Sequence, residues 1–486
     1  MAQEVDVVIV GAGISGLASA IYLKQAGIES FVLLEKGGEV GGTWRENTYP
    51  GAACDVPSHL YSFSFEPNPH WSHAFSPQAE ILEYLKHCAR KYGLLPHLRF
   101  HAQVNEAEFD EAQGKWTVRT RDGQRFRARA LVLGNGALHL PAFPEIAGRE
   151  RFQGTAFHSA QWRHDYDLTD KTVAVIGTGA SAIQFVPQVA ARARKLYLFQ
   201  RNPPWILPRL DKAFSEARRR LFSRVPGLAR LYRSALYWNL EWHAVAFLRK
   251  TWFTRLIEWV SRRHLEASVP DVALRARLTP RYRLGCKRVL VSDDYYPALN
   301  RPNVELVTEG IESIGPRGVR TRDGVEHEVD AIVYGTGFDV AHYLSPIRIV
   351  GREGRELNES WNGTPSTYLG ITVSGFPNLF LLMGPNTGLG HNSMIFMIEA
   401  QARYAVQCIQ ALRSQDLRWL DVRPGVQAAF TESLREKMRE TVWQTGGCRS
   451  WYQTPEGHNV TLWPGFTFDY WLRTRQVHLG DYTVRL

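Results

Sequence analysis

Paired cysteines and long apolar runs are both missing from this chain of 486 residues. Its five cysteines form no Cys-x-x-Cys pair and follow no regular spacing, which argues against a redox-active pair, a zinc site and a disulfide framework. We therefore expect no metal ion and reduced thiols in a cytoplasmic protein, the cysteines being Cys54, Cys88, Cys286, Cys408 and Cys448.

The N-terminal segment also lacks the basic residues of a signal peptide, so we expect none. The apolar stretch through residues 7–23 is interrupted by glycines, which indicates a strand, a turn and a helix instead of a membrane span. The composition, 44% hydrophobic and 22% charged, is typical of a globular protein, and the length indicates two or three domains.

Acidic residues are scarce in one segment. Residues 209–283 hold 17 Lys/Arg and 6 Asp/Glu, while the whole chain has a net charge of +10. One basic segment in an otherwise neutral chain indicates a local surface patch, so we expect no nucleic-acid partner. A solvated face explains this charge; the alternative is peripheral contact with an anionic membrane.

The same segment is rich in helix formers, and its tryptophans have helical spacing. Trp238 and Trp242 are four residues apart, and Trp252 and Trp259 are seven apart. This spacing predicts amphipathic helices. We expect the aromatic stripe to form core or a pocket wall, with a membrane contact as the alternative.

A first glycine-rich turn follows a β-branched apolar run and precedes a helical pattern. The segment "DVVIVGAGISGLASAIYLKQAG" places Gly11, Gly13 and Gly16 in the spacing GxGxxG, and the next apolar run ends in Glu35. Such glycines permit a tight turn, close approach of a pyrophosphate and packing of the helix on the strand. The helix N-terminus attracts phosphate charge, and Glu35 can accept hydrogen bonds from a ribose diol. We interpret this unit as an FAD site.

A second unit, "KTVAVIGTGASAIQFVPQVA", repeats the pattern with Gly177, Gly179 and Ala182. Its second strand ends in Gln200 and Arg201, where an NAD site would have a carboxylate. A cation at this position suits a 2′-phosphate, so we interpret the unit as an NADPH site. The alternative for Arg201 is an ordinary surface arginine.

Two further strand-like segments, 130–141 and 330–339, end in glycines and are placed to cross between the two nucleotide domains. The sequence therefore predicts an α/β fold of two Rossmann-like dinucleotide-binding domains with a helical insert. We expect the FAD domain, the NADPH domain, the insert, and the returning parts of the NADPH and FAD domains to occupy residues 1–145, 146–208, 209–285, 286–340 and 341–486.

Two longer strings connect the chain to a known family. Residues 152–162, "FQGTAFHSAQW", fit the pattern FxGxxxHxxxW, and residues 41–55, "GGTWRENTYPGAACD", fit GGxWxxxxYPGxxxD. On these motifs the chain resembles the type I Baeyer–Villiger monooxygenases, which are class B flavoprotein monooxygenases. The resemblance extends to residues 450–471. It departs at Arg163, where longer versions of the fingerprint usually have Pro or Asp, so the subgroup stays open.

The resemblance implies an FAD-dependent, NADPH-consuming enzyme that inserts one oxygen atom of dioxygen next to a ketone carbonyl, giving an ester or lactone through a peroxyflavin. An N- or S-oxygenating flavin-containing monooxygenase of the same architecture is the alternative; Trp162 favours ketone oxidation, because the string of that relative usually ends in another aromatic residue. A third possibility is a basic membrane- or nucleic-acid-binding protein with a vestigial flavin.

The resemblance also assigns roles around the reacting centre. Arg288, in "YRLGCKRVLVSDDYY", matches the active-site arginine, and Asp55 matches the carboxylate that orients it. A fixed cation would stabilise the negative charge that develops on oxygen. Lys287 matches the residue that helps Arg201 to hold the 2′-phosphate. An interdomain salt bridge is the alternative role for Arg288 and Asp55.

Other matched residues line the cofactors or couple the domains. Trp451 matches a residue of a mobile loop that closes over nicotinamide and substrate, with a core tryptophan as the alternative. His158 has no partner at metal-ligand spacing, and we interpret it as a hinge-side residue and not as a proton donor. The flavin-side residues implied are Thr43, Trp44, Asp55, Tyr61 and Met394, and the domain-coupling residues are Phe152, Gly154, His158 and Trp162.

Overall fold

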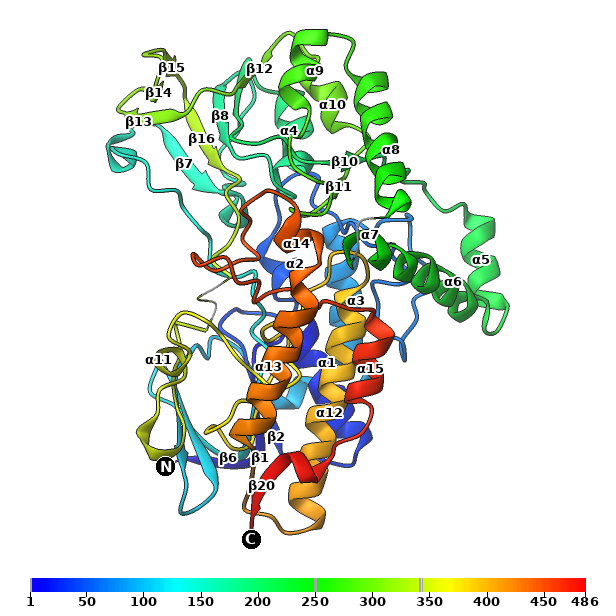
Figure 1. The fold of residues 1–486 in the computed structure, drawn as a ribbon, viewed down its shortest axis with the longest axis vertical. Coiled ribbons are helices and arrows are strands. Elements are labelled where there is room, and N and C mark those ends of the chain that lie inside the picture. Colours follow the sequence, from blue (N-terminus) through cyan, green and yellow to red (C-terminus); the bar gives the residue numbers. More distant parts are fainter. Residues whose placement is uncertain (1, 249–250, 341, 343) are drawn as a thin grey trace.

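Two β-sheets, each with a glycine-rich turn after a central strand, organise the fold. The computed structural model describes residues 2–248, 251–340, 342 and 344–486. The two sheets lie at opposite ends of the long axis, and a group of helices projects to one side (Figure 1). The predicted α/β class with two Rossmann-like units is confirmed.

The first sheet is built around β1 (Gln3–Val10), whose last four side chains are all buried. A β-branched run of this kind is typical of a parallel strand covered on both faces. β1 pairs in parallel with both of its neighbours, and the order is β17-β4-β5-β6-β1-β2-β3 with β18 beside β6. The other strands are β2 (Phe31–Leu34), β3 (Leu98–Arg99), β4 (Val104–Asp110), β5 (Lys115–Thr120), β6 (Arg125–Leu133), β17 (Arg348–Val350) and β18 (Leu379–Leu381).

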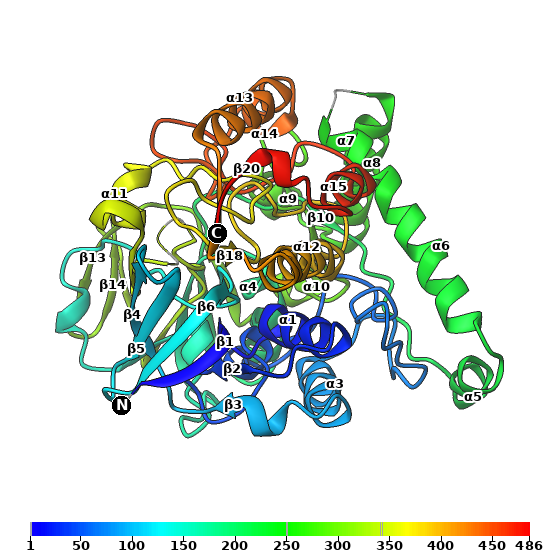
Figure 2. The same ribbon diagram turned by 90° about the horizontal axis from the view of Figure 1, so that it is seen from below.

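The C-terminal part of the chain returns to this sheet. α1 (Ile14–Gln25) packs against α12 (Met394–Ser414), and Figure 2 shows the two helices side by side. The remaining elements of this half are α2 (Thr43–Glu46), α3 (Gln78–Lys91), α11 (Leu357–Trp361), α13 (Pro424–Arg439), α14 (Val442–Thr445), α15 (Thr467–Thr474) and the antiparallel pair β19 (Trp419–Val422) and β20 (Tyr482–Arg485).

The second sheet is entirely parallel, in the order β12-β9-β8-β16-β7. The string that opens at Phe152 supplies its edge strand, β7 (Thr155–His158). The helices α4 and α10 pack against each other beside this sheet, and a small antiparallel sheet follows β12. The bounds are β8 (Thr172–Ile176), α4 (Ala182–Ala190), β9 (Lys195–Phe199), α10 (Tyr295–Leu299), β12 (Val304–Val307), β13 (Ile311–Gly315), β14 (Gly318–Thr321), β15 (Glu326–Glu328) and β16 (Ala331–Tyr334).

The two crossing segments lie side by side. The Ala142 N–H donates to the Gly337 carbonyl at 2.9 Å, and the Asp339 N–H donates to the Leu140 carbonyl at 2.9 Å. The paired backbone joins the two sheets through two hydrogen-bonded chains instead of one free linker. The division into five chain segments remains a prediction.

A helical insert separates β10 (Ile206–Leu207) from β11 (Leu290–Val291), which pair with each other. A buried arginine attaches the insert to the first domain: Arg233 donates to the carbonyl oxygens of His59 and Leu60 at 2.9 and 2.8 Å. Burial lowers the pKa of Arg233. The helices of the insert are α5 (Glu216–Arg224), α6 (Leu228–Trp242), α7 (Ala244–Leu248), α8 (Trp252–Ser268) and α9 (Val272–Leu278).

A buried carboxylate attaches the other end of α6. Glu241 accepts hydrogen bonds from the N–H and hydroxyl of Thr467 at 2.5 and 2.8 Å and from the Asn392 amide at 2.6 Å. Burial raises the pKa of Glu241, but its partners His391, Thr467 and Asn392 outweigh this and hold the pKa below its ordinary value. The carboxylate also lies at the N-terminus of α15, where the helix dipole favours negative charge.

The tryptophans of the insert contradict the expectation of a core or pocket wall. Trp238, Trp242, Trp252 and Trp259 are 53%, 68%, 76% and 55% exposed. They lie on the outer faces of α6 and α8, because Arg233, Glu241, Ile257 and other residues occupy the inner faces. Arg249 and Lys250, which contribute to the basic excess, lie outside the described residues. Among the described helices, none combines the length and apolarity needed to cross a bilayer.

The cysteines contradict the sequence expectation in part. Cys286 and Cys448 form a disulfide bond, although 162 residues separate them. The other three, Cys54, Cys88 and Cys408, are free and buried, as the expectation of reduced thiols requires. Local spacing could not reveal this pair because the fold alone brings α14 and its C-terminal flank against the segment before β11.

Candidate active site

The first glycine turn requires glycine at two positions for steric reasons. Gly11 has φ of 93°, and a Cβ on Gly16 would lie 1.8 Å from the Gly11 carbonyl oxygen. A Cβ on Gly13 would meet only Gly42, at 3.5 Å. The packing of the protein therefore does not require glycine at position 13, whereas a phosphate approaching the start of α1 would.

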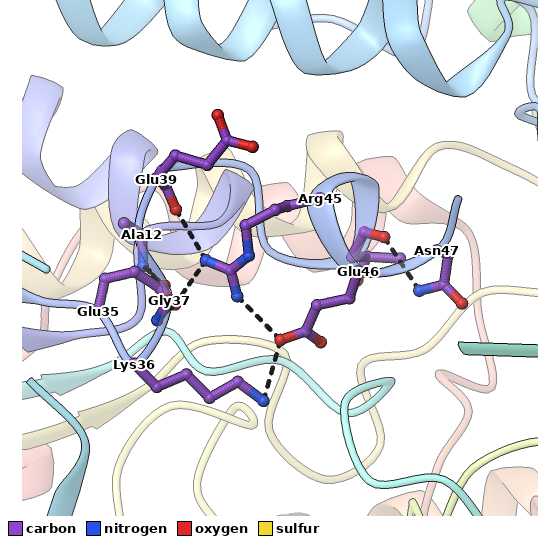
Figure 3. Close-up of polar contacts among 9 residues, drawn as sticks. Ala12, Glu35, Lys36, Gly37, Glu39, Arg45, Glu46 and Asn47 are labelled. Atoms are coloured by element: carbon purple, nitrogen blue, oxygen red, sulfur yellow. Dashed lines mark hydrogen bonds and ion pairs between the residues drawn. The ribbon is translucent and has the colours of Figure 1, made fainter. Parts of the chain in front are cut away.

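A buried carboxylate lies directly beside this turn. Glu35, at the end of β2, accepts from the Ala12 N–H at 2.9 Å and from the Gly37 N–H at 2.7 Å, as Figure 3 shows. Only 3% of Glu35 is exposed. These bonds fix the carboxylate at the edge of the turn, which is the position that a ribose-binding acid occupies in a dinucleotide fold.

Arg45, which the sequence analysis missed, completes this network. It donates to Glu35 at 2.7 Å, to the Glu39 carbonyl at 2.7 Å and to Glu46 at 2.9 Å (Figure 3). Burial lowers the pKa of Arg45, but the carboxylates of Glu35 and Glu46 raise it above its ordinary value. The sequence signal that could have identified Arg45 was its position directly after Trp44 in the GGTW string.

The implied flavin-side residues lie close to this turn and to the core. The Trp44 indole N–H donates to the Tyr61 hydroxyl at 3.2 Å, and burial raises the pKa of Tyr61. Thr43 is the exposed first residue of α2, and half-buried Met394 is the first residue of α12. Trp44 and Met394 both pack with the core that contains α1.

The YPG part of the GGTW string docks on the second nucleotide unit. Gln184 of α4 donates to the Ala53 carbonyl at 2.9 Å and accepts from the Tyr49 hydroxyl at 3.0 Å. A Cβ on Gly51 would lie 2.7 Å from the Gln184 carbonyl oxygen, so glycine lets the two segments approach closely. The string thus positions Asp55, four residues on, next to the second unit.

The second glycine turn has the same construction as the first. Gly177 has φ of 110°, and a Cβ there would lie 2.4 Å from the Gly335 carbonyl oxygen. A Cβ on Gly179 would meet no atom within 4 Å, which leaves space before α4. Ala182 begins α4 and is fully buried against the sheet.

A basic pocket opens at the end of β9. Arg201 and Lys287 both line a cavity of about 690 Å³, together with Gln200 and Tyr282. Burial lowers the pKa of Lys287, and the positive charge of Arg201 lowers it further. The structure thus brings the two cations close enough to repel each other, an arrangement that an anion would stabilise.

Arg288 and Asp55 meet although they are 233 residues apart in the chain. The Nε and Nη2 groups of Arg288 donate to Asp55 Oδ2 at 3.1 and 2.6 Å. The Asp55 carboxylate raises the pKa of Arg288, so the guanidinium keeps its charge. The Arg288 side chain is still 37% exposed, which leaves donor groups available to a ligand.

Tyr452 lies next to this pair, and sequence reasoning did not find it. It is 1% exposed, and burial raises its pKa to about 12, with Arg288 acting in the opposite direction. The neighbouring Trp451 is 48% exposed, which excludes a core role for it. The segment that follows Cys448 therefore reaches both the disulfide bond and the Arg288–Asp55 pair.

The histidine of the FxGxxxH string is enclosed at the crossing between the sheets. His158 is fully buried, and its Nδ1 accepts from the Ala160 N–H at 3.1 Å. Its ring packs edge-on against Phe143, two residues after the first crossing segment, and against Phe338 of the second. Burial lowers the pKa of His158, which favours the neutral ring.

The other residues of that string pack within the second unit. A Cβ on Gly154 would lie 2.5 Å from the Asp330 carbonyl oxygen and would also meet the Phe152 ring. The Trp162 ring contacts Phe185 of α4 at a centroid distance of 5.4 Å. These contacts attach the string to β16 and α4.

The donor set at the two glycine turns fits two dinucleotides. Over residues 2–248, 251–340, 342 and 344–486, no group of three His, Cys, Asp or Glu side chains is placed to hold a metal ion. Both glycine turns lie at helix N-termini, which suit a pyrophosphate. The buried carboxylate at the first turn matches a cofactor without a 2′-phosphate, and the basic pocket at the second matches a cofactor with one.

Comparisons with known proteins agree with this geometry. Residues 4–415 match the model of a family described as flavin-binding monooxygenase-like. A Baeyer–Villiger monooxygenase of Pseudomonas aeruginosa is 46% identical over 482 residues, which cover 99% of this chain and 92% of the relative. A solved structure of an oxidised steroid monooxygenase bound to NADP superimposes with a TM-score of 0.88, at 31% identity and with 99% and 100% of the two chains covered. A structure described as OTEMO in complex with FAD and NADP gives a TM-score of 0.90, at 26% identity and with 99% of each chain covered.

Proposed function

The chain belongs to the flavin-binding monooxygenase-like family, and on that premise we propose how its residues divide the work of an FAD- and NADPH-dependent Baeyer–Villiger monooxygenase. Such an enzyme inserts one oxygen atom of dioxygen next to a ketone carbonyl and forms an ester or lactone. The observation that carries this assignment is the Arg288–Asp55 pair, which the fold assembles between two dinucleotide turns.

The first turn holds FAD. Its pyrophosphate would be held at the N-terminus of α1, where Gly13 gives room and the helix dipole attracts negative charge. Glu35, fixed by Ala12 and Gly37, accepts hydrogen bonds from the adenosine ribose. The residues that would lie along the flavin side are Thr43, Trp44, Asp55, Tyr61 and Met394.

The second turn holds NADPH. Gly177, Gly179 and Ala182 accommodate the pyrophosphate at the start of α4, and Arg201 and Lys287 bind the 2′-phosphate in the basic pocket. Each charge-assisted hydrogen bond to this phosphate contributes roughly 1.5–3 kcal/mol. Trp451, which is 48% exposed, would close over the nicotinamide and the substrate.

Arg288 supplies a fixed positive charge at the reacting centre. When bound, the flavin supplies the redox chemistry, since it accepts electrons from NADPH and activates dioxygen. Attack on a carbonyl carbon places negative charge on oxygen, and a preorganised guanidinium stabilises that charge more than it stabilises the neutral ketone. Asp55 holds Arg288 in one orientation. The buried Tyr452 lies next to the pair.

His158 couples the two domains instead of moving a proton. It lies between Phe143 and Phe338, and its buried ring is held neutral. A movement of either crossing segment would therefore be transmitted to the other through this ring.

Product analysis tests the assignment directly. We expect the enzyme with FAD and NADPH to convert members of a panel of linear, cyclic and aryl ketones into products heavier by one oxygen atom, and ester hydrolysis to release the corresponding alcohol and acid. A thioether and a tertiary amine in the same panel test the N- or S-oxygenating alternative. Oxygenation of those two substrates with no ester from any ketone would contradict ketone oxidation.

The exposed tryptophans of the insert support peripheral contact with an anionic membrane. Trp238 and Trp242 on α6 and Trp252 and Trp259 on α8 are all more than half exposed, within a segment with 11 more basic than acidic residues. Indole rings favour the membrane interface, and basic side chains near an anionic surface contribute about 1 kcal/mol each. A second copy of this chain would bring the same positive charge to the contact, so self-association through this face is unfavourable. Membrane contact would bring apolar ketones to the enzyme.

Vesicle sedimentation tests this contact. We expect the protein to sediment with phosphatidylserine-containing vesicles and much less with neutral ones, and salt to weaken binding. The double substitution Trp252→Ser and Trp259→Ser should weaken it about tenfold, roughly 1.4 kcal/mol, while Leu95→Ser, at an exposed site outside the insert, should not. Equal binding by all three proteins, or none to anionic vesicles, would exclude the tryptophan face as the contact.

A further inference from the structure

A further basic side chain reaches the pocket of Arg201 and Lys287 from the C-terminal part of the chain. The same cavity of about 690 Å³ is lined by Gly447, Cys448 and Arg449. These residues follow α14, far in sequence from the second glycine turn, and no motif of the sequence pointed to them. The pocket is therefore assembled from both nucleotide units.

The disulfide bond attaches this segment to the pocket wall. Cys448 is bonded to Cys286, the residue before Lys287. The Arg283 N–H donates to the Gly446 carbonyl at 3.1 Å, and a Cβ on Gly446 would lie 2.6 Å from the Cys286 Cβ. Arg449 directly follows Cys448, and Lys287 directly follows Cys286. Each of these basic residues is thus one residue away from the disulfide bond.

A 2′-phosphate can accept hydrogen bonds from more than two basic side chains. A phosphate monoester carries about −1.5 to −2 charges at pH 7 and has three terminal oxygen atoms. Arg201 is exposed, and burial together with the charge of Arg201 lowers the pKa of Lys287. Of the other three arginines in the lining, Arg277 donates to the Leu306 carbonyl. Arg281 and Arg449 are both exposed, and only Arg449 is adjacent to a cysteine of the disulfide bond. A guanidinium can donate two parallel hydrogen bonds to a phosphate.

We propose that Arg449 is a specificity-determining residue that binds the 2′-phosphate of NADPH, and that the Cys286–Cys448 bond holds it in place. The inference rests on the proposed position of the NADPH site. It makes NADPH affinity depend on the redox state of the cysteine pair. A dithiol opens the bond by exchange: the dithiol is oxidised to its cyclic disulfide, and Cys286 and Cys448 become thiols.

Direct binding measurements separate this proposal from catalysis. The FAD-loaded enzyme is titrated calorimetrically with adenosine 2′,5′-bisphosphate and with 5′-AMP, which lacks the 2′-phosphate. Arg449→Gln should weaken binding of the bisphosphate about tenfold and leave 5′-AMP unchanged. Arg439→Gln, an exposed arginine of α13 outside the pocket lining, is the matched control and should change neither.

Arg201→Gln distinguishes failure of the inference from failure of its premise. If Arg201→Gln weakens bisphosphate binding and Arg449→Gln does not, Arg449 has no part in recognition and the proposal is wrong. If neither substitution has an effect, the phosphate lies elsewhere, and the proposed NADPH site is wrong as well.

The disulfide is tested separately. The denatured, unreduced protein should show three titratable thiols, from Cys54, Cys88 and Cys408; five would overturn the role of the bond. Reduction by dithiothreitol, and Cys448→Ser, should each reproduce the loss caused by Arg449→Gln, with no further loss in Arg449→Gln itself. Retained flavin absorbance identifies folded protein in every sample. Undiminished bisphosphate binding by reduced, folded enzyme would show that the bond does not hold Arg449.

Discussion

Replacing Arg288 by alanine should lower ester formation by roughly a hundred- to a thousandfold, because it removes one preorganised charge from the transition state. FAD should stay bound, since Arg288 contacts Asp55 and not the first glycine turn. NADPH should still be oxidised, and the dioxygen consumed should appear as hydrogen peroxide instead of ester. Stopped-flow absorbance for the reduction step, with parallel ester and peroxide assays, measures each part.

Two further variants sharpen this test. Arg288→Lys should recover little activity, because an ammonium cannot donate from both Nε and Nη2 to Asp55. Asp55→Asn keeps the cation but removes its charged partner, so it should reduce ester yield less than Arg288→Ala does. Arg301→Ala, at an exposed position after α10, is the control and should behave as the unmodified enzyme. An ester yield from Arg288→Ala equal to that of Arg301→Ala would remove Arg288 from the mechanism.

Gly16→Ala should prevent the first domain from folding. The added Cβ would lie 1.8 Å from the Gly11 carbonyl oxygen, within backbone that also forms the start of α1. Neither element can move without breaking the contact between α1 and β1, so we expect a loss of more than about 4 kcal/mol, a large part of the stability of an ordinary domain. Soluble yield, flavin content per chain and thermal unfolding measure the outcome.

Gly13→Ala is the matched control in the same turn. Its Cβ would approach Gly42 only to 3.5 Å, and φ of −80° suits alanine. This variant should fold but retain less FAD, because the methyl group would occupy space needed by the pyrophosphate. Equal stability of the two variants would refute the steric argument, and full FAD retention by Gly13→Ala would move the pyrophosphate away from this glycine.

Much of the fold could be predicted because its signals are local. Gly11 and Gly177 have positive φ where the sequence places the first glycine of each turn, and the apolar runs before them form buried parallel strands. Glu35 lies at the end of the second strand because a βαβ unit has a fixed connectivity. The tryptophan spacing likewise gave the helices of the insert, since amphipathic periodicity is a property of consecutive residues.

Which face of a helix is buried depends on residues outside that helix, and here the sequence expectation was wrong. The tryptophans of α6 and α8 were expected to be covered, yet Arg233 and Glu241 take the buried face of α6. Both charges are stabilised there by partners from residues 59–62 and 392–468, which no pattern within the insert reveals. Burying those charges without such partners would cost several kcal/mol each.

The sequence by itself determined two dinucleotide turns and a helical insert, because each depends on residue types at fixed short spacing. It also predicted that the two turns differ in cofactor preference at Arg201. Only the tertiary structure decided that Cys286 is bonded to Cys448, that Tyr452 lies beside Arg288, and that Arg449 lines the basic pocket. In each case the packing of the C-terminal segment against the chain before β11 sets the contact. Residues more than a hundred positions apart meet because the two segments bury apolar surface against each other, and the sequence of one segment alone does not reveal that contact.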